Sequence, residues 1–159
     1  MAEKEMLHRR FLKSSTTEYE LGTFLPERVT LRQNEDPIDL TSVAKTGNGS
    51  VLFFISSSCE ACNAEAVREA IQTYPEFSYI VFYEGSRNPI PSAFLESRHV
   101  AHHSFQIDLL VKNMNLNMLP YQLVLNQVGQ VIAAGIINTL PMIEDLMMPL
   151  IRAAGKIKQ

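Results

Sequence analysis

The sequence has 159 residues, 46% of them hydrophobic, and its seventeen acidic and fourteen basic residues give a net charge of −3. This length suits one globular domain with a sizeable core. The basic residues are scattered, which favours neither nucleic acid nor an acidic membrane as a partner. No apolar run approaches the roughly 18–20 residues that cross a bilayer, and the N-terminus has charges where a signal peptide needs an apolar centre. We therefore expect a soluble monomer without direct membrane insertion.

The N-terminal third divides into an arm and the start of a domain. Residues 1–20 are mostly charged or hydroxylated and predict a flexible arm, and residues 21–159 form the predicted domain. A loop should lead into a strand-like run within LGTFLPERVTLRQ, and a short helical piece is expected within DPIDLTSVAKTGNGS. Next, VLFFI at 51–55 is a continuous run of β-formers, typical of a strand buried on both faces of a parallel or mixed sheet.

In the middle of the chain, the spacing of the apolar residues changes from that of a strand to that of a helix. Apolar residues at 64, 67, 70 and 71 recur at helical spacing and predict a helix of about residues 60–74. FSYIVFYEG predicts a second buried strand, and the order strand, helix, strand implies parallel pairing. A loop and a short helix are expected in SRNPIPSAFLESRHVAHH, with its histidines in a polar loop region. The segment FQIDLLVKNMNL is ambiguous between strand and helix.

The C-terminal third predicts a hairpin and a helix. YQLVLNQVGQVIAAG has two apolar runs around residues 126–129, the pattern of a β-hairpin. TLPMIEDLMMPLIRAAG predicts a terminal helix with Thr139 as its N-cap and Arg152 near its end, although Pro149 is expected to kink that helix or end it early. The whole pattern predicts an α/β domain with a central mixed sheet of four or five strands flanked by helices, preceded by an extension of a strand and a short helix.

Both cysteines of the chain, Cys59 and Cys62, lie where the first buried strand gives way to the predicted helix. The free N–H groups and the dipole at a helix start stabilise a thiolate at Cys59. A two-residue gap also brings the two sulfurs within disulfide reach. This context indicates a redox pair in which Cys59 attacks a disulfide and Cys62 resolves the mixed disulfide. Two inert buried thiols are the structural alternative.

These residues resemble the thioredoxin-like superfamily, and the chain is most similar to the TlpA/ResA group of disulfide reductases and to the thioredoxin-like proteins of methylamine-dehydrogenase maturation. The similarity covers roughly residues 21–150 and rests on LGTFLPERVTL, VLFFISSSCEACNAE and MLPYQLVLNQVGQVIAAG. It implies a thioredoxin-like fold, thiol–disulfide exchange without organic cofactor or metal, protein thiol or disulfide substrates, and an upstream redox partner. By this match, Pro120 is a cis-proline and Leu119 presents its backbone to the substrate.

The chain departs from the family pattern near the cysteines. Ser58 replaces the aromatic residue before the first cysteine, and Val67 stands near the proline of the redox helix. Phe53 falls where thioredoxin has its buried carboxylate, so another base, water or the substrate must accept the proton. Glu60 puts a carboxylate between the cysteines and disfavours the thiolate of Cys59, which favours a reductant over an oxidant. A carboxylate at a helix start also interacts favourably with the helix dipole.

Three other functions fit parts of the sequence. Two thiolates with histidines from the set His99, His102 and His103 could form a zinc or copper site, although the copper proteins that resemble peroxiredoxins space their cysteines by three residues. Ser56 matches the hydroxyl of the peroxiredoxin cysteine pattern, but Leu52 stands where that pattern has proline. A non-catalytic binding module would use the fold without needing the cysteines.

The sequence and the resemblance point to different locations. The resemblance implies the extracytoplasmic side of a bacterial membrane, reached through an anchor absent from this chain. The sequence by itself indicates the cytoplasm, since no targeting segment is visible in it.

Overall fold

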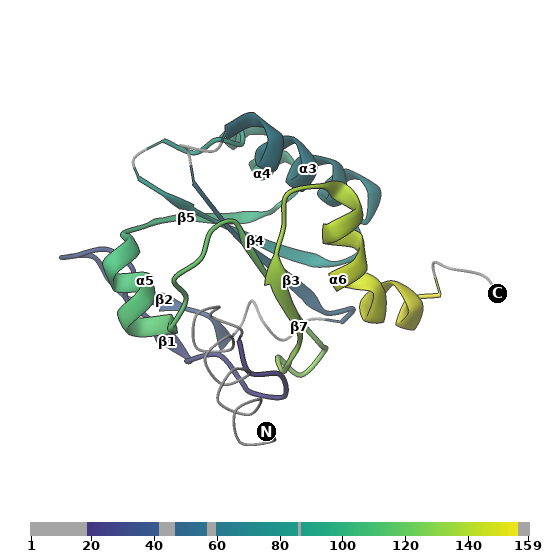
Figure 1. Cartoon of the computed structure of the whole chain (residues 1–159), viewed down its shortest axis with the longest axis horizontal. Helices are drawn as coiled ribbons and strands as arrows, with labels where there is room; N and C mark the ends of the chain where they lie inside the picture. Colours follow the sequence, from purple (N-terminus) through teal and green to yellow (C-terminus); the bar gives the residue numbers. More distant parts are fainter. Residues whose placement is uncertain (1–18, 42–46, 57–59, 86, 156–159) are drawn as a thin grey trace, which may run out of the picture.

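The structure is a computed structural model that describes residues 19–41, 47–56, 60–85 and 87–155, with the backbone alone for residues 60–63. Within these ranges a five-stranded mixed sheet lies between helices (Figure 1). Its strands are β3 (Ser50–Ser56), β4 (Ser78–Glu84), β5 (Ala101–Phe105), β6 (Tyr121–Leu125) and β7 (Val131–Ile136). The helices are α3 (Glu60–Thr73), α4 (Ser92–Ser97), α5 (Ile107–Met114) and α6 (Leu140–Ala153). The predicted α/β class and central mixed sheet are confirmed.

The VLFFI segment forms the middle strand of the sheet. The strand order is β5-β4-β3-β6-β7, with β3, β4 and β5 parallel to one another, β6 antiparallel to β3, and β7 antiparallel to β6. Because of these directions, the carboxyl ends of β3, β4, β5 and β7 meet the start of β6 at one edge of the sheet. We call this the carboxyl edge; its strand termini are Ser56, Glu84, Phe105, Tyr121 and Ile136.

Alternation along β3 explains why this strand is apolar at five successive positions. Val51, Phe53 and Ile55 belong to a core shared with α3, α4 and α6 on one face of the sheet, whereas Leu52 and Phe54 belong to a second core shared with α5 and the N-terminal segment. All five side chains are fully buried. A strand with cores on both faces needs apolar residues at every position, as the sequence indicates.

The start of β3 depends on a glycine. Gly49 has φ of +103°, a conformation that disfavours residues with a side chain. A Cβ at this position would also lie 2.9 Å from the backbone oxygen of Leu125 on the neighbouring strand. The glycine therefore lets the chain turn closely past β6 before it enters the sheet.

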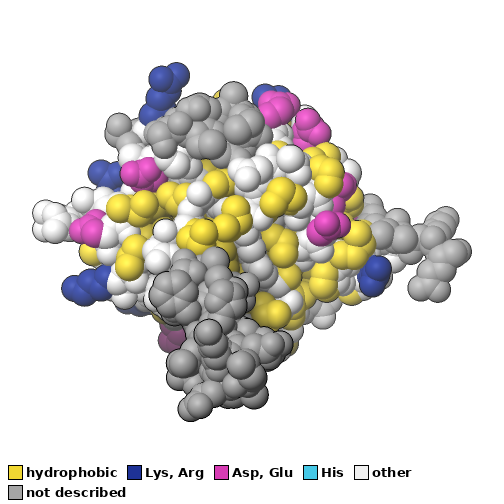
Figure 2. Space-filling view, viewed as in Figure 1, with side chains coloured by type: hydrophobic (Ala, Val, Ile, Leu, Met, Phe, Trp, Pro, Cys, Tyr) yellow, Lys and Arg dark blue, Asp and Glu magenta, His cyan; other side chains and the backbone are white. Residues whose placement is uncertain are grey.

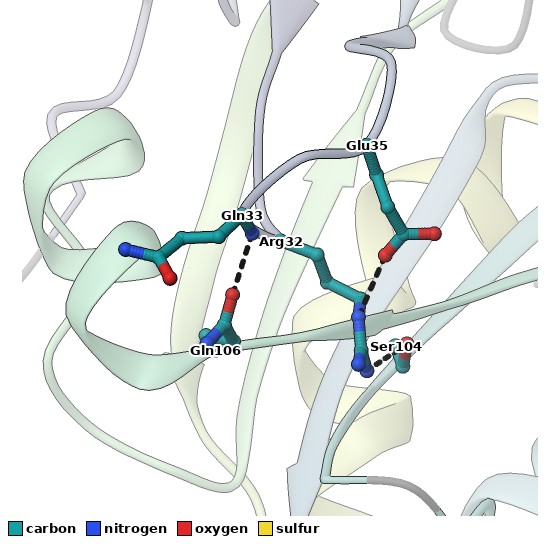
Figure 3. A network of polar contacts seen from close by, with 5 residues as sticks. All are labelled: Arg32, Gln33, Glu35, Ser104 and Gln106. Carbon is teal, nitrogen blue, oxygen red and sulfur yellow. Dashed lines mark hydrogen bonds and ion pairs between the residues drawn. The ribbon is translucent and has the colours of Figure 1, made fainter.

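The N-terminal extension is a small sheet that packs against β5 and α5. Strands β1 (Arg28–Val29) and β2 (Ile38–Asp39) pair antiparallel, so a two-stranded sheet stands where one strand is predicted, and residues 42–46 of the predicted helical piece lie outside the described residues. The Arg32 guanidinium donates to Ser104 Oγ at 2.8 Å and forms an ion pair with Glu35, and the Gln33 N–H donates to the Gln106 side chain (Figure 3).

The segment after α4 differs from the predicted polar loop. His102 and His103 lie in β5, which pairs with β4 in parallel. β5 is the outermost strand on one side of the sheet, so its half-buried polar side chains keep contact with solvent. A polar sequence can therefore form a strand there. The ambiguous segment that follows is helix α5, whose inner face has Leu110 and Met114 buried at i and i+4.

The predicted hairpin and terminal helix are both present. β6 and β7 are joined through residues 126–130, and the Asn126 side chain accepts hydrogen bonds from the N–H groups of Val128 and Gln130. Thr139 caps α6 by accepting from the Met142 N–H. Of the two effects expected of Pro149, the early end is wrong, because the helix continues to Ala153, and the kink stays a prediction. Burial of the following Leu150 and Ile151 offsets the hydrogen bond lost at the proline.

Across the described ranges, none of the helices has the length and apolar content that crossing a membrane requires.

Tyr74 connects the end of α3 to α6, and its replacement gives a first prediction. Its hydroxyl donates to Glu144 Oε2 at 2.6 Å, and this hydrogen bond, followed by partial burial and nearby negative charge, raises the pKa of Tyr74 to about 12. Tyr74→Phe should lower the free energy of unfolding at pH 7 by about 1 kcal/mol, as measured by urea denaturation.

The pH dependence of this contact has a defined sign. The folded-state pKa of Tyr74 exceeds its ordinary value of 10.0, so the contribution is complete below pH 10 and is lost as pH rises through about 12. Tyr74→Phe should therefore lose less stability than the wild type between these values. Equal losses in the two chains would show that the hydroxyl contributes nothing.

Candidate redox site

The Cys-x-x-Cys motif spans the start of the helix that follows the middle strand. β3 ends at Ser56 and α3 begins at Glu60, close to the predicted helix of 60–74. Cys59 is in the segment 57–59, outside the described residues. Cys62 lies in the first turn of α3, and for it and Glu60 the structure describes the backbone alone. The roles of these three side chains therefore stay predictions.

Pro120 lies at the same edge of the sheet. The Leu119–Pro120 peptide bond is cis, as the sequence predicts. Pro120 immediately precedes β6, whose first residue, Tyr121, is paired with Phe54 of β3. Its carbonyl oxygen accepts a hydrogen bond from the Ile137 N–H at 3.3 Å. The loop before β6 is thus held beside the end of β3, and its role in binding substrate stays a prediction.

The position of thioredoxin's buried carboxylate is apolar in this chain. Phe53 is fully buried and lies opposite Gln122 of β6 in the antiparallel ladder. The Gln122 side chain is also fully buried; its Nε2 donates to the Ile143 carbonyl at 3.4 Å, while its Oε1 has no hydrogen-bond partner within the described ranges. An amide does not act as a base near neutral pH. The pair Phe53 and Gln122 therefore supplies no proton acceptor in place of the carboxylate.

Sequence reasoning missed a carboxylate at the carboxyl edge. Glu84 ends β4 directly beside Ser56, which ends β3, in the parallel register. The Ser56 hydroxyl donates to Glu84 Oε1 at 2.8 Å. Ser56 is buried and Glu84 is half-buried. The segment FSYIVFYEG predicts the strand, but only the register between two parallel strands brings this carboxylate next to the residue that precedes the cysteine segment.

Exposed apolar side chains occur at this edge as well. Ile136 at the end of β7 is 37% exposed, and Met142 in the first turn of α6 is 39% exposed. Leu119, which directly precedes Pro120, is half-buried. Figure 2 shows apolar side chains gathered across the face that carries β7 and α6, with charged groups mainly at its rim. This surface suits contact with apolar segments of another protein.

The three histidines considered as metal ligands do not converge. Neighbours on a strand point to opposite faces, and accordingly His103 contacts the Phe82 ring while His102 lies 3.8 Å from a Glu96 oxygen. Burial, followed by the charge of His102, lowers the pKa of His103. His99 lies in a turn after α4 with φ of +57°. Among the residues described, no three His, Cys, Asp or Glu side chains are grouped to hold a metal ion.

A cavity of about 650 Å³ lies between the N-terminal segment and the C-terminal part of β5. Its lining includes Arg32, Glu35, His103 and Ser104, some of which appear in Figure 3. β4 separates β5 from β3 in the sheet. The cavity is therefore two strands away from the strand that leads to the cysteines, and it is not part of the candidate redox site.

Comparisons with known proteins show the fold. No protein-family model and no curated protein sequence matches the chain. Solved structures do match: a thiol:disulfide interchange protein from Bacteroides sp. is 11% identical with a TM-score of 0.54 and covers 79% of this chain and 89% of its own. The thioredoxin domain of a thiol-disulfide oxidoreductase from Bacteroides vulgatus is 13% identical with a TM-score of 0.53 and covers 80% and 98%.

A third structure, a secreted disulfide oxidoreductase from Mycobacterium tuberculosis, is 18% identical with a TM-score of 0.52 and covers 79% of this chain and 94% of its own. These similarities are similarities of the fold as a whole. The protein has a thioredoxin-like fold.

Proposed function

We propose that the protein is a thiol–disulfide oxidoreductase that exchanges the Cys59 and Cys62 dithiol with disulfides of other proteins. The observation that supports this most is the position of the Cys-x-x-Cys motif, which begins after the middle strand β3 ends at Ser56 and runs into the first turn of α3. In a thioredoxin-like fold this junction exposes a helix N-terminus, where free N–H groups stabilise a thiolate.

The reaction has two exchange steps. The Cys59 thiolate attacks a substrate disulfide, forms a mixed disulfide and releases one substrate thiolate. The Cys62 thiolate then attacks the Cys59 sulfur, closes an intramolecular disulfide and releases the second substrate thiolate. Two electrons pass to the substrate, whose two thiolates take up two protons, and an upstream dithiol partner must return the pair to its reduced form.

The surroundings of the junction fit a protein substrate. Pro120 and Leu119 adjoin the start of β6 at the carboxyl edge, where an extended substrate segment could contact their backbone. Ile136 and Met142 add exposed apolar surface in the same part of the molecule. Such a surface suits disulfide-bonded chains that expose apolar segments, and we infer that the substrates are proteins rather than small disulfides.

The direction of exchange follows from the charges near the cysteines. Glu60 follows Cys59 directly, and the sequence has no basic residue between the cysteines. A carboxylate there disfavours the thiolate form of the reduced pair and so offsets the stabilisation by the helix N-terminus. We infer that the pair acts as a reductant.

Reduction of insulin tests the activity. In the presence of dithiothreitol at pH 7, the wild-type chain should accelerate the precipitation of insulin chains, and Cys59→Ser should reduce this to the background rate, because serine does not form a nucleophilic anion at this pH. Val128→Ser is a matched control, since Val128 is 57% exposed in the β6–β7 loop at the opposite end of the sheet. If Cys59→Ser kept the wild-type rate, the proposal would be wrong.

A further inference from the structure

We propose that Glu84 is a positioning residue that makes the cysteine pair more reducing through the negative charge it holds at the carboxyl edge. This inference rests on the proposed function. It assigns to the chain a second carboxylate, besides Glu60, that disfavours the reduced thiolate, and it draws on the described contacts of Glu84 and Ser56.

The sheet fixes the position of the Glu84 carboxylate. β3 and β4 are parallel and end level with each other, since Ser56 pairs with Glu84 in the register. Their side chains lie on the same face as the stacked rings of Phe54 and Phe82, two residues earlier on each strand. The hydrogen bond of 2.8 Å from Ser56 Oγ holds Glu84 Oε1 at the end of β3. The charge is therefore held where the chain leaves the sheet for the cysteine segment.

Chain connectivity keeps Cys59 close to Ser56, the residue that holds this charge by a hydrogen bond. Cys59 follows Ser56 by three residues, which span at most about 11 Å between Cα atoms even when fully extended. Electrostatic screening in about 0.1 M salt has a length of about 10 Å. At about 10 Å from a thiolate, a unit charge partly shielded from water by the protein alters the equilibrium that forms the thiolate by about two- to tenfold.

The charge has no described counter-ion. None of the ion pairs found within the described residues involves Glu84. The hydrogen bond from the neutral Ser56 hydroxyl orients the carboxylate and leaves its charge in place. The nearest arginine in the sequence, Arg87, is exposed in the following loop. Glu84 therefore places a net negative charge at the carboxyl edge.

This field should favour the oxidised pair. Oxidation of the dithiol by glutathione disulfide forms one Cys59–Cys62 disulfide and two glutathione thiols, with two electrons and two protons transferred to glutathione. The reduced protein is a dithiol in equilibrium with its thiolate, and the disulfide is uncharged. A nearby carboxylate raises the free energy of the thiolate alone, so it destabilises the reduced form in proportion to the fraction that is ionised and makes the protein a stronger reductant.

Glu84→Gln tests the inference in a glutathione redox titration at about pH 9, where a cysteine with a pKa near the ordinary value of about 8.5 is largely thiolate in the reduced protein. Glutamine has the same shape and keeps an oxygen that can accept from Ser56, so the variant removes the charge and retains the contact. The equilibrium should shift about 1.5- to eightfold toward the reduced protein, which is a reduction potential about 5–27 mV less negative. Glu84→Asp, which keeps the charge, should remain closer to the wild type than Glu84→Gln does.

Glu27→Gln is the matched control for net charge. Glu27 is exposed and lies beside Val128 and Gly129 at the opposite end of the sheet, so its removal should leave the equilibrium unchanged. The inference is overturned if Glu84→Gln behaves as the wild type, or if Glu27→Gln shifts the equilibrium equally. A wild-type chain that forms no intramolecular disulfide would instead overturn the proposed function, and with it this inference.

Discussion

Replacing Cys62 by Ser is expected to trap a covalent complex between Cys59 and its substrate. The first exchange step needs Cys59 alone, whereas release of the substrate needs the second thiol. Without Cys62 the mixed disulfide persists until an external thiol reaches it. Incubation of the variant with oxidised insulin or a cell extract should therefore give new bands on non-reducing gels that disappear on reduction.

The control for trapping is the double variant Cys59→Ser, Cys62→Ser, which should form no such bands. Cys59→Ser alone should form few, because Cys62 lies in the first turn of α3 rather than before it. If Cys59→Ser trapped substrates as well as Cys62→Ser did, the assignment of separate attacking and resolving roles to the two cysteines would be wrong. Absence of complexes with every variant would count against protein disulfides as substrates.

Phe54→Ala is expected to cause a large loss of stability. Phe54 is fully buried on β3, its ring stacks on Phe82 with centroids 4.7 Å apart, and it meets Phe105 edge-on at 6.4 Å. Truncation removes these contacts and leaves a cavity, which costs about 3–5 kcal/mol. This corresponds to a fall of about 6–20 °C in the midpoint of thermal unfolding.

Two controls make the result for Phe54 specific. Phe54→Leu fills most of the volume and should cost about 1–1.5 kcal/mol, and Val128→Ala, at a side chain 57% exposed, should change the stability by less than about 0.5 kcal/mol. A loss below about 1 kcal/mol for Phe54→Ala, measured by urea denaturation, would contradict the position of this ring between the strands and α5.

The elements that sequence predicts well have strong local signals. VLFFI is continuously apolar because cores lie on both faces of β3, and the spacing of Ala64, Val67 and Ala70 follows the buried face of α3. The β6–β7 turn has an Asn126 that bonds to the loop backbone. In each case the residues that form the element also determine its type, so neighbouring positions are sufficient for the prediction.

The elements that sequence predicts poorly depend on distant partners. The strand β5 has the polar sequence AHHSF and exists through pairing with β4. α6 continues past Pro149 because Leu150 and Ile151 are buried on the core. Local propensity favours a loop in the first case and a helix end in the second, and tertiary packing overrides both.

The candidate site also combines residues that the sequence identifies with residues that only the fold brings together. Cys59 and Cys62 are visible as a motif, and the resemblance indicates Pro120. The contact between Ser56 and Glu84 is not visible in the sequence, because the two residues are far apart in the chain and only the parallel register of β3 and β4 brings them together. The same holds for Gln122, which the antiparallel register sets opposite Phe53.

The central claim is that Cys59 and Cys62 form one reversible disulfide that serves as a reductant. It is tested most directly by equilibrating the wild-type chain with glutathione buffers at pH 7, followed by thiol alkylation and peptide mapping. We expect a single disulfide linking Cys59 to Cys62, with a reduction potential near that of thioredoxin, about −270 mV. The absence of this disulfide, or a potential near about −120 mV as in strong oxidants, would contradict the claim.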